Sequence, residues 1–343
     1  MRGPAQGPTP CRAITTTHEH RAVSVIEYRA FRNGDSPALA EIWRARARER
    51  GLMQTMSAQL LEQFVFSKPY FDNDGLIVAV DDSRLVGFVH AGFGATEDEK
   101  HLSTDMGVTC MLMVGGEHRR LGIGTELLAH SERYLRGRGA QVLYGGGIAP
   151  LNPFYLGLYG GSELPGVLNS DEAALQLYES RGYQAIDHTV ILQRHLSDFR
   201  PPVDRRQLQL RRTTKVHISD DPPSATWWGA CTYGGFARTR FDLMLSSTGE
   251  SAARVTFWEI EPLSSSWGVR TVGLIDLEVR EDCRRQGYAT ALVSEALREL
   301  QTVGFGAVEV QTMQANQAAL DLYAKLGFNT VDGGTVFRKE ATA

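Results

Sequence analysis

Apolar residues recur along the chain in short blocks with the spacing of strands or of one-sided helices. Leu76–Val80 and Leu85–His90 are apolar runs separated by a three-residue polar turn, which predicts a hairpin. Upstream, three apolar residues spaced as one face of a helix predict a helix over Pro37–Arg50. Alternation and helical spacing thus both occur in the first hundred residues, as expected for a chain that mixes strands and helices.

An internal repeat organises the rest of the chain. Residues 119–125 (RRLGIGT) match residues 284–290 (RRQGYAT) at an offset of 165. Residues 171–178 (DEAALQLY) match residues 316–323 (NQAALDLY) at an offset of 145. The first copy therefore carries 20 extra residues between the two motifs, in an insertion near residues 145–170. Order, spacing and residue type are preserved twice, which indicates a duplication.

Each copy predicts the same succession of elements. A strand runs into the arginine-glycine loop, a helix follows, and a second strand and a second helix come next. Gly182 and Gly327 stop the second helices. The expected strands are Met111–Val114, Val142–Tyr144, Val272–Val279 and Ala307–Gln311, and the expected first helices are Thr125–Arg136 and Thr290–Leu300. The fold class is therefore α/β (α+β), with a mixed, partly parallel sheet flanked by helices in each half.

The repeat also divides the chain. We expect a disordered leader over residues 1–24, a first domain over 25–196, a charged, proline-broken linker over 197–207 and a second domain over 208–343. A single core for 343 residues would exceed the usual size of one domain.

Composition excludes several classes of protein. The chain has 36 Lys+Arg against 40 Asp+Glu, a net charge of -4, so a dedicated nucleic-acid binder is disfavoured. The sequence has no apolar run long enough for a transmembrane helix, which predicts no membrane partner. The four cysteines show no CxxC pair and the nine histidines no metal spacing. We therefore predict no metal site and a reducing, cytoplasmic location.

The repeated loop has the chemistry of a phosphate site. Glycines at Gly122 and Gly124 let the backbone approach a ligand closely, and the following helix offers free N–H groups and a positive dipole end. The spacing matches neither the P-loop nor the dinucleotide fingerprint. A plain strand-turn-helix corner would explain one such loop, but its recurrence ahead of a Leu-Tyr helix favours a binding function.

These motifs resemble those of the GNAT (Gcn5-related N-acetyltransferase) superfamily. Leu277-x-Val279 followed by Arg284-x-x-Gly287-x-Ala289 is similar to its acyl-CoA-binding motif, and the segment from Asn316 to Phe328 is similar to its second motif. The first half has counterparts of both. A tandem pair is similar to the mycothiol synthase arrangement, although nothing points to that substrate.

The resemblance implies that the loop amides hold the pyrophosphate of acetyl-CoA and that the pantetheine arm lies between two strands that separate. It implies direct acyl transfer to an amine without a metal. The implied cofactor-binding residues of the second half are Leu277, Val279, Arg284, Arg285, Gln286, Gly287, Tyr288, Ala289, Thr290 and Asn316. Those of the first half are Leu112, Val114, Arg119, Arg120, Leu121, Gly122, Ile123, Gly124 and Thr125.

The resemblance also implies a proton donor for the leaving thiolate. Tyr323 and Tyr178 hold the position of the family tyrosine, and a phenol can donate as the sulfur gains charge. The alternative is that each tyrosine only packs its helix on the sheet.

The two halves differ on the strand before the loop. Asp276 and Glu278 align with Met111 and Met113, and a strand period of two would place both carboxylates on one side of the sheet. One of them could relay a proton from the amine; the alternative is a solvated or salt-bridged face. Asp171 stands where the family has asparagine, which puts in doubt a hydrogen bond to the pantetheine arm in the first half.

We therefore expect an acetyl-CoA-dependent N-acetyltransferase that acts mainly at the C-terminal site on an amine-bearing small molecule or peptide, as a monomer or homodimer. The alternatives are a catalytic N-terminal domain with a structural C-terminal domain, or a non-catalytic acetyl-CoA sensor. The aromatic, glycine-rich insertion is expected to cover the N-terminal acceptor cleft as a lid; otherwise it packs its aromatics on the other domain.

Overall fold

The computed structural model describes residues 25–46 and 49–340, together with Gly3. The predicted leader therefore lies almost wholly outside the described residues. The first copy comprises β1 (Glu27–Ala30), α1 (Ser36–Arg44), α2 (Ala58–Leu61), β2 (Leu76–Asp81), β3 (Arg84–Ala95), β4 (Leu102–Val114), α3 (Ile123–Gly137), β5 (Val142–Gly145), β6 (Val167–Leu168), α4 (Glu172–Ser180) and β7 (Gln184–His195).

The second copy follows the same plan after an additional helix. It comprises α5 (Arg205–Thr213), β8 (Thr214–Asp220), α6 (Trp227–Tyr233), β9 (Arg238–Leu245), β10 (Ser251–Glu259), α7 (Glu261–Trp267), β11 (Thr271–Val279), α8 (Tyr288–Thr302), β12 (Ala307–Met313), α9 (Gln317–Lys325) and β13 (Asn329–Glu340). Short 3-10 turns precede both arginine-glycine loops, at Gly116–His118 and Glu281–Cys283.

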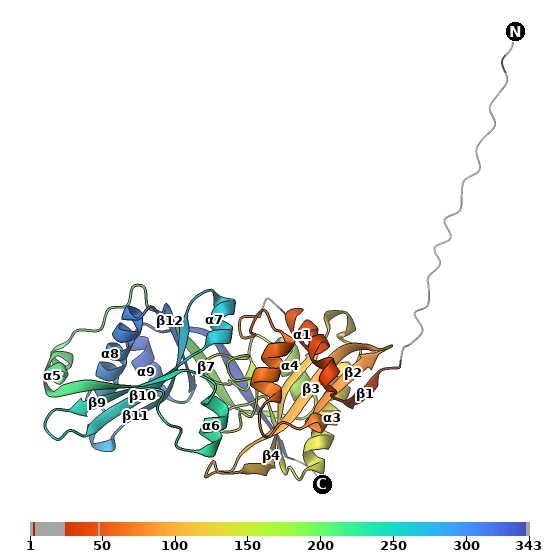
Figure 1. Cartoon of the computed structure of the whole chain (residues 1–343), viewed down its shortest axis with the longest axis horizontal. Helices are drawn as coiled ribbons and strands as arrows, with labels where there is room; N and C mark the ends of the chain where they lie inside the picture. Colours follow the sequence, from red (N-terminus) through yellow and green to blue (C-terminus); the bar gives the residue numbers. More distant parts are fainter. Residues whose placement is uncertain (1–2, 4–24, 47–48, 341–343) are drawn as a thin grey trace.

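One continuous sheet passes through both halves (Figure 1). Its order is β1-β2-β3-β4-β5-β13-β7-β12-β11-β10-β9-β8, with β6 paired to β13. The last strand of each copy is exchanged: β13 pairs with β5 of the first copy, and β7 pairs with β12 of the second. The two exchanged strands also pair with each other. The linker in the sequence therefore does not correspond to a gap in the sheet.

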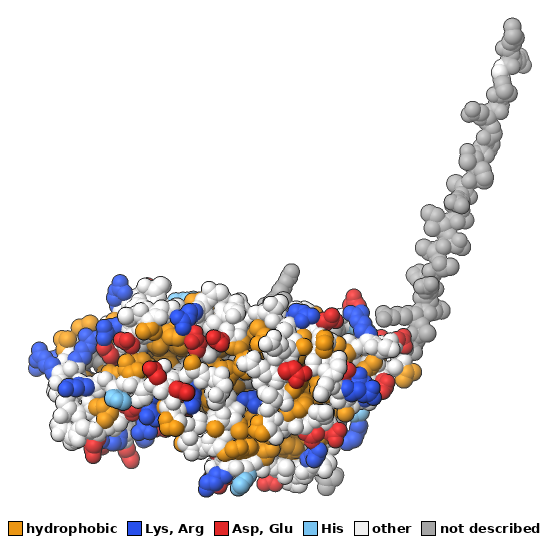
Figure 2. Space-filling model, viewed as in Figure 1, with side chains coloured by type: hydrophobic (Ala, Val, Ile, Leu, Met, Phe, Trp, Pro, Cys, Tyr) orange, Lys and Arg blue, Asp and Glu red, His pale blue; other side chains and the backbone are white. Residues whose placement is uncertain are grey.

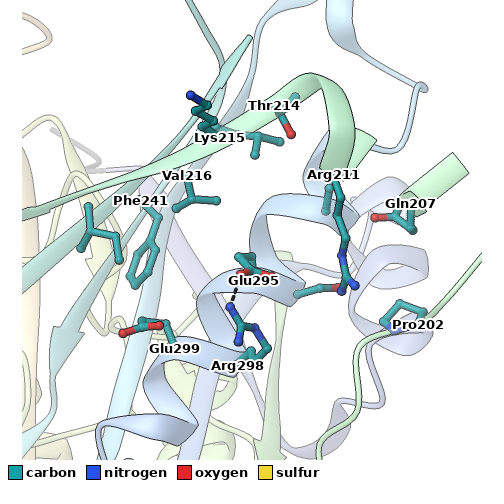
Figure 3. Close-up of a pocket in the computed structure, with 14 residues that line it drawn as sticks. Pro202, Gln207, Arg211, Thr214, Lys215, Val216, Phe241, Glu295, Arg298 and Glu299 are labelled. Carbon is teal, nitrogen blue, oxygen red and sulfur yellow. Dashed lines mark hydrogen bonds and ion pairs between the residues drawn. The ribbon is translucent and has the colours of Figure 1, made fainter. Parts of the chain in front are cut away.

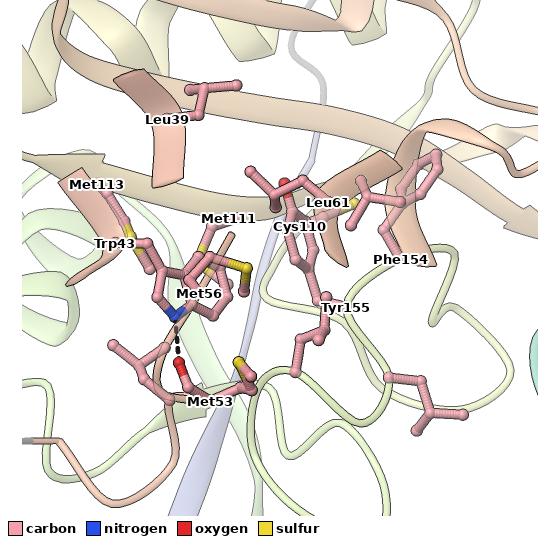
Figure 4. Packing of buried hydrophobic residues seen from close by; sticks show 14 of the residues in the cluster. Leu39, Trp43, Met53, Met56, Leu61, Cys110, Met111, Met113, Phe154 and Tyr155 are labelled. Atoms are coloured by element: carbon pink, nitrogen blue, oxygen red, sulfur yellow. Dashed lines mark hydrogen bonds between the residues drawn. The ribbon is translucent and has the colours of Figure 1, made fainter. Parts of the chain in front are cut away.

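Helices and the insertion cover the two faces of this sheet. In the second half α8 and Tyr323 of α9 pack into one apolar core with Leu274, whereas the next strand residue, Ile275, belongs to a different core. That second core joins the halves: it contains α1, the aromatic residues of the insertion and Trp258 (Figure 4). Alternation along β11 thus sends neighbouring side chains to opposite faces.

Most predicted elements are confirmed. The hairpin forms between β2 and β3, and its turn residues Asp82 and Ser83 have positive φ. The helix expected over Pro37–Arg50 is shorter, because α1 ends at Arg44 and Arg46 instead pairs with Glu49 and Asp171. Within the described residues, no helix is long and apolar enough to span a bilayer.

Candidate functional site

The two arginine-glycine loops have the same backbone geometry. Gly122 and Gly287 precede α3 and α8 in the left-handed conformation, with φ of 82° and 87°. Two residues earlier, Arg120 and Arg285 also have positive φ, 64° and 61°. The duplication has therefore preserved the loop shape as well as its sequence, and only glycine adopts φ near 85° without a steric cost.

This geometry leaves several backbone amides unpaired by the helix. The bonds from Glu126 N–H to Gly122 and from Ala291 N–H to Gly287 close the first turns of α3 and α8. The N–H groups of the three residues in between lie ahead of the helical hydrogen-bond ladder and at its positive end. Each loop is thus a cradle for an anionic group such as a pyrophosphate.

The predicted binding residues contribute in different ways. Most loop side chains are exposed, but Ile123 and Thr290 are buried, so these two residues can offer only their backbone to a ligand. The first arginine of each loop donates from Nε to the carbonyl at the end of the preceding strand: Arg119 to Val114 at 3.3 Å, and Arg284 to Val279 at 3.2 Å. These arginines therefore also fix the loop to the sheet.

Next to each loop, two parallel strands separate. β4 and β5 pair only as far as Thr109 and Gly145, and β11 and β12 only as far as Leu274 and Val310. Beyond these points the strands no longer share hydrogen bonds. In the first half a cavity of about 30 Å³ lies there, with residues 109–113 of β4 and Tyr178 among its lining.

The insertion forms part of the wall of that cavity. Gly146, Tyr159 and Gly166 line it, so the insertion lies against the strand separation of the first half. Tyr155 and Phe154 are buried beside Met111 in the core that joins the halves (Figure 4). The insertion thus both encloses the first site and packs its aromatics against a core shared with the second half.

Tyr178, which lines this cavity, is otherwise tightly packed. It is 3% exposed, stacks on Phe337 and meets Tyr183 edge-on. A Cβ on Gly145 would lie 2.6 Å from its ring, so glycine at the end of β5 makes room for the phenol. Burial raises the pKa of Tyr178 well above its ordinary value.

Tyr323, in the second half, is buried and feels the charge of one carboxyl group. Tyr323 is 4% exposed, and burial, followed by the charge of Glu163, raises its pKa. Burial and then the charge of Glu278 raise the pKa of Asp276. Glu163 belongs to the insertion of the first half and was not singled out by the sequence. The only sign of Glu163 in the sequence was that it is a carboxylate in an otherwise apolar, glycine-rich insertion.

The strand carrying the predicted carboxylates is irregular. β11 contains a bulge opposite Arg254 and Thr256, and Asp276 has φ of 51°. A strict period of two therefore does not run through Asp276 and Glu278, although both residues are exposed. Glu278 is 70% exposed and lies 4.0 Å from Arg254, an arrangement typical of a solvated ion pair.

The helices after the strand pairs have matching N-caps. Asp171 and Asn316 each accept a backbone N–H at 3.2 Å, from Ala174 and Ala319. Asp171 also pairs with Arg46 at 2.6 Å. The carboxylate in the first half is thus already engaged by a cap and a cation.

A feature that the sequence did not indicate lies over the second loop. Gln207 of α5 donates to the carbonyl of Gly287 at 3.3 Å, and Arg206 to that of Arg285 at 3.4 Å. A cavity of about 750 Å³ extends from Gln207 between α5, β8 and α8 (Figure 3). It lies beside α8, away from Asp276 and Tyr323. Gly122, by contrast, has no neighbouring atom within 4 Å of where a Cβ would stand.

Comparison with known proteins identifies this loop-and-helix unit. The sequence profile of the acetyltransferase (GNAT) family matches residues 36–160 and 206–328, well over half of the chain. The chain belongs to the GNAT family of acetyltransferases. It contains two GNAT units in tandem, and the α/β class and partly parallel sheet expected from the sequence are confirmed.

Solved structures share this tandem fold. The GCN5-related glucosamine N-acetyltransferase region of a fungal multi-domain GH3 β-N-acetylglucosaminidase aligns with a TM-score of 0.70 and 18% identity, covering 93% of this chain and 38% of that one. The chain thus spans about two fifths of that protein. A GCN5-related N-acetyltransferase from Sphaerobacter thermophilus aligns with a TM-score of 0.60 and 16% identity, covering 92% of this chain and 95% of that one. A tandem GNAT protein from the clavulanic acid biosynthesis pathway aligns with a TM-score of 0.63 and 15% identity, covering 93% of this chain and 99% of that one. No curated protein matches the chain.

The GNAT family generally uses acetyl-CoA, and two cradles of the required kind are present. Among the described residues, no cluster of three or more His, Cys, Asp or Glu is arranged to hold a metal ion. Basic and acidic side chains are interspersed on the face shown in Figure 2, rather than gathered by sign.

Proposed function

We propose that this GNAT protein transfers the acetyl group of acetyl-CoA directly to an amine acceptor, mainly at its C-terminal site. The observation that carries the proposal is the position of Tyr323, a buried phenol that feels the charge of Glu163 and packs in one core with Leu274 and Val310, where β11 and β12 separate. In the first half, the carboxylate whose charge reaches Tyr178 is Asp171, which is already engaged by Arg46 and by its N-cap bond.

Binding in this proposal follows the geometry of the loop. The amides around Gly287 hold the pyrophosphate, with Arg285 and Gln286 exposed beside it. Leu277 and Val279 flank the pantetheine arm on the strand, and Asn316 caps the helix next to it. The thioester then lies between the separated strands, within reach of Tyr323.

The reaction needs two proton transfers. The amine nitrogen attacks the thioester carbonyl, an N–C bond forms and the C–S bond breaks. Tyr323 gives its proton to the leaving thiolate, and a carboxylate beside the acceptor takes the proton that the amine loses; the sequence offers Asp276 and Glu278 for this role. A raised pKa keeps the phenol protonated until the sulfur gains charge.

The N-terminal site has a second candidate role, as an acyl-CoA site with little or no turnover. Its loop is open at Gly122, which favours binding, but Met111 and Met113 offer no proton acceptor. Catalysis in the N-terminal domain, or acetyl-CoA sensing without turnover in either half, are the alternatives that experiment must separate.

The acceptor in this proposal is a small molecule or peptide with a free amine. Glucosamine is a useful first probe, because the structurally similar fungal region is named as a glucosamine N-acetyltransferase. We also propose a cytoplasmic monomer or homodimer without nucleic-acid or membrane partners; the free thiols Cys110, Cys231 and Cys283 are in keeping with a reducing compartment.

The test is a screen of amines by release of free CoA thiol. We expect glucosamine, other amino sugars, polyamines or peptides with free N-termini to include at least one amine that increases thiol release over the rate without acceptor. Slow hydrolysis that no amine increases, with acetyl-CoA still bound in calorimetry, would support the sensor instead.

A further inference from the structure

The insertion of the first half crosses onto the second half and is fixed there by side chains of β10 and β12. Ser162 N–H donates to Glu309 Oε1 at 2.7 Å, and Trp258 Nε1 donates to the Ser162 carbonyl at 3.0 Å. A Cβ on Gly273 would lie 2.8 Å from Ser162 Cβ, so glycine on β11 permits this close approach. The segment is therefore held against β11 and β12.

Its next residue, Glu163, lies where these strands separate. Gln311 Nε2 donates to the Glu163 carbonyl at 2.6 Å, and Gln311 directly follows Val310, the last β12 residue paired with β11. On β11, Asp276 stands two residues beyond the last paired residue, Leu274. Glu163 thus approaches the same opening that Tyr323 reaches from α9.

The same placement brings the charge of Glu163 to bear on Asp276 and Tyr323. Burial, followed by the charge of Asp276, raises the pKa of Glu163 to about 7. The charge of Glu163 in turn raises the pKa of Tyr323 and of the buried Tyr233. A carboxyl group that titrates near neutrality is suited to accept a proton at physiological pH.

Two polar atoms beside Glu163 have no partner. Among the described residues, Ser162 Oγ and Gln311 Oε1 are buried side-chain atoms without a hydrogen bond. Buried polar atoms are normally paired, so an unpaired amide oxygen on the residue that holds the Glu163 backbone points to a ligand that donates hydrogen bonds. An amine has this chemistry.

Glu309 holds the segment in place. It is fully buried, accepts from Ser162 and from Gln193 Nε2 at 3.1 Å, and pairs with Arg50. These contacts join the insertion, β7 and β12, so Glu163 is presented by a well-anchored backbone. In the first half, the position aligned with Asp276 is Met111, which the insertion covers with Tyr155.

We propose that Glu163, supplied by the first half, is the catalytic residue that takes the proton from the amine acceptor at the C-terminal site. This rests on the proposed function of that site. As the N–C bond forms, the amine proton passes to the Glu163 carboxylate; as the C–S bond breaks, Tyr323 protonates the thiolate. The proton gained by Glu163 equals the one lost by Tyr323, so exchange through water restores both groups.

The experiment is the pH dependence of kcat/KM for Glu163→Gln, with the best amine from the screen. In the native protein the rate should rise with pH through an apparent pKa near 7, because the carboxylate must be deprotonated to accept a proton. Glu163→Gln should lower kcat by on the order of 10²–10⁴ and remove this rising part of the pH profile (the limb), with acetyl-CoA affinity nearly intact. Glu163→Asp should restore part of the rate and the limb. Glu179→Gln, an exposed carboxylate on α4, should change neither.

A second variant keeps the test decisive if Glu163→Gln does not fold. Asp276→Asn removes the negative charge that helps to raise the pKa of Glu163, so the limb should move to lower pH. Two results would overturn the role of Glu163. One is a folded Glu163→Gln variant with the rate and pH profile of the native protein. The other is an Asp276→Asn variant whose pH profile does not move. If instead Tyr323→Phe and Gly287→Val both leave turnover unchanged, the proposed C-terminal function itself fails.

Discussion

The two GNAT units hold their loops in one conformation and surround their tyrosines with different chemistry. The glycine φ values at Gly122 and Gly287 differ by only a few degrees, and the strand-tethering arginines make equivalent bonds. Tyr178 is packed against aromatic rings and feels the charge of Asp171, which Arg46 already pairs, whereas Tyr323 feels the charge of Glu163 from the other half. Duplication has thus kept the anion cradle and changed the surroundings of the reacting atoms.

The insertion accounts for much of this difference. Tyr155 packs beside Met111 in the first half, and Glu163, eight residues later, reaches the second. One segment therefore closes one site with apolar side chains and supplies the other with charge. The comparison can be tested by making the same change in both halves.

The largest expected effect is at the tyrosines. Tyr323→Phe should lower turnover by on the order of 10²–10⁴, because the thiolate loses its general acid, and acetyl-CoA affinity should stay nearly constant. Tyr178→Phe should change turnover little. Steady-state kinetics with free-thiol detection measures both, and a loss of activity with Tyr178→Phe alone would reverse the assignment of the working half.

A smaller effect is expected at the loop glycines. Valine at Gly122 or Gly287 must adopt a left-handed conformation, which costs roughly 1–2 kcal/mol, so each variant should weaken acetyl-CoA binding at its own site by about tenfold. Gly287→Val should also disturb α5, since a Cβ there would lie 2.9 Å from Arg206 Cδ. Calorimetry should show one site altered in each variant. Unchanged stoichiometry and affinity in the double variant would refute both binding sites.

The smallest effect concerns the helix caps. Asn316→Ala should lower the free energy of unfolding by about 1 kcal/mol through loss of the N-cap bond to Ala319. Asp171→Ala should lower it by more, because it also leaves Arg46, a largely buried cation, with one carboxylate fewer. Urea denaturation of the two variants compares these losses, and equal losses would show that the Arg46 pair adds nothing.

Local pattern was enough to find the elements that lie close together in sequence. The loops, the helices after them and the paired tyrosines could be located because glycine spacing and helical periodicity act over a few residues. The bulge at Asp276 could not be predicted in this way, because a side-chain period of two assumes a regular strand. The pairing of Arg46, just after the early end of α1, with Asp171 could not be found either, because Asp171 lies far along the chain.

The parts that escaped prediction are long-range contacts. Nothing near Glu163 in the sequence indicates that its neighbours are Asp276 and Tyr323, because the connection runs through the fold of both halves. The same holds for Gln207 on Gly287: the residue lies in a segment that reads as the end of a linker. Pairing partners of β7 and β13 are likewise set by which edges are free, not by their own residues.

The exchanged strands bear on how the chain is made. Gly145, at the end of β5, pairs with Phe337, which a ribosome adds only after the linker and most of the second copy. Domains usually fold as units from the N-terminus as they emerge, but here the first GNAT unit must wait for the last strand of the second. Contacts between such distant residues also slow folding. A cut at the linker would therefore yield two halves that each lack a strand and expose an unpaired sheet edge.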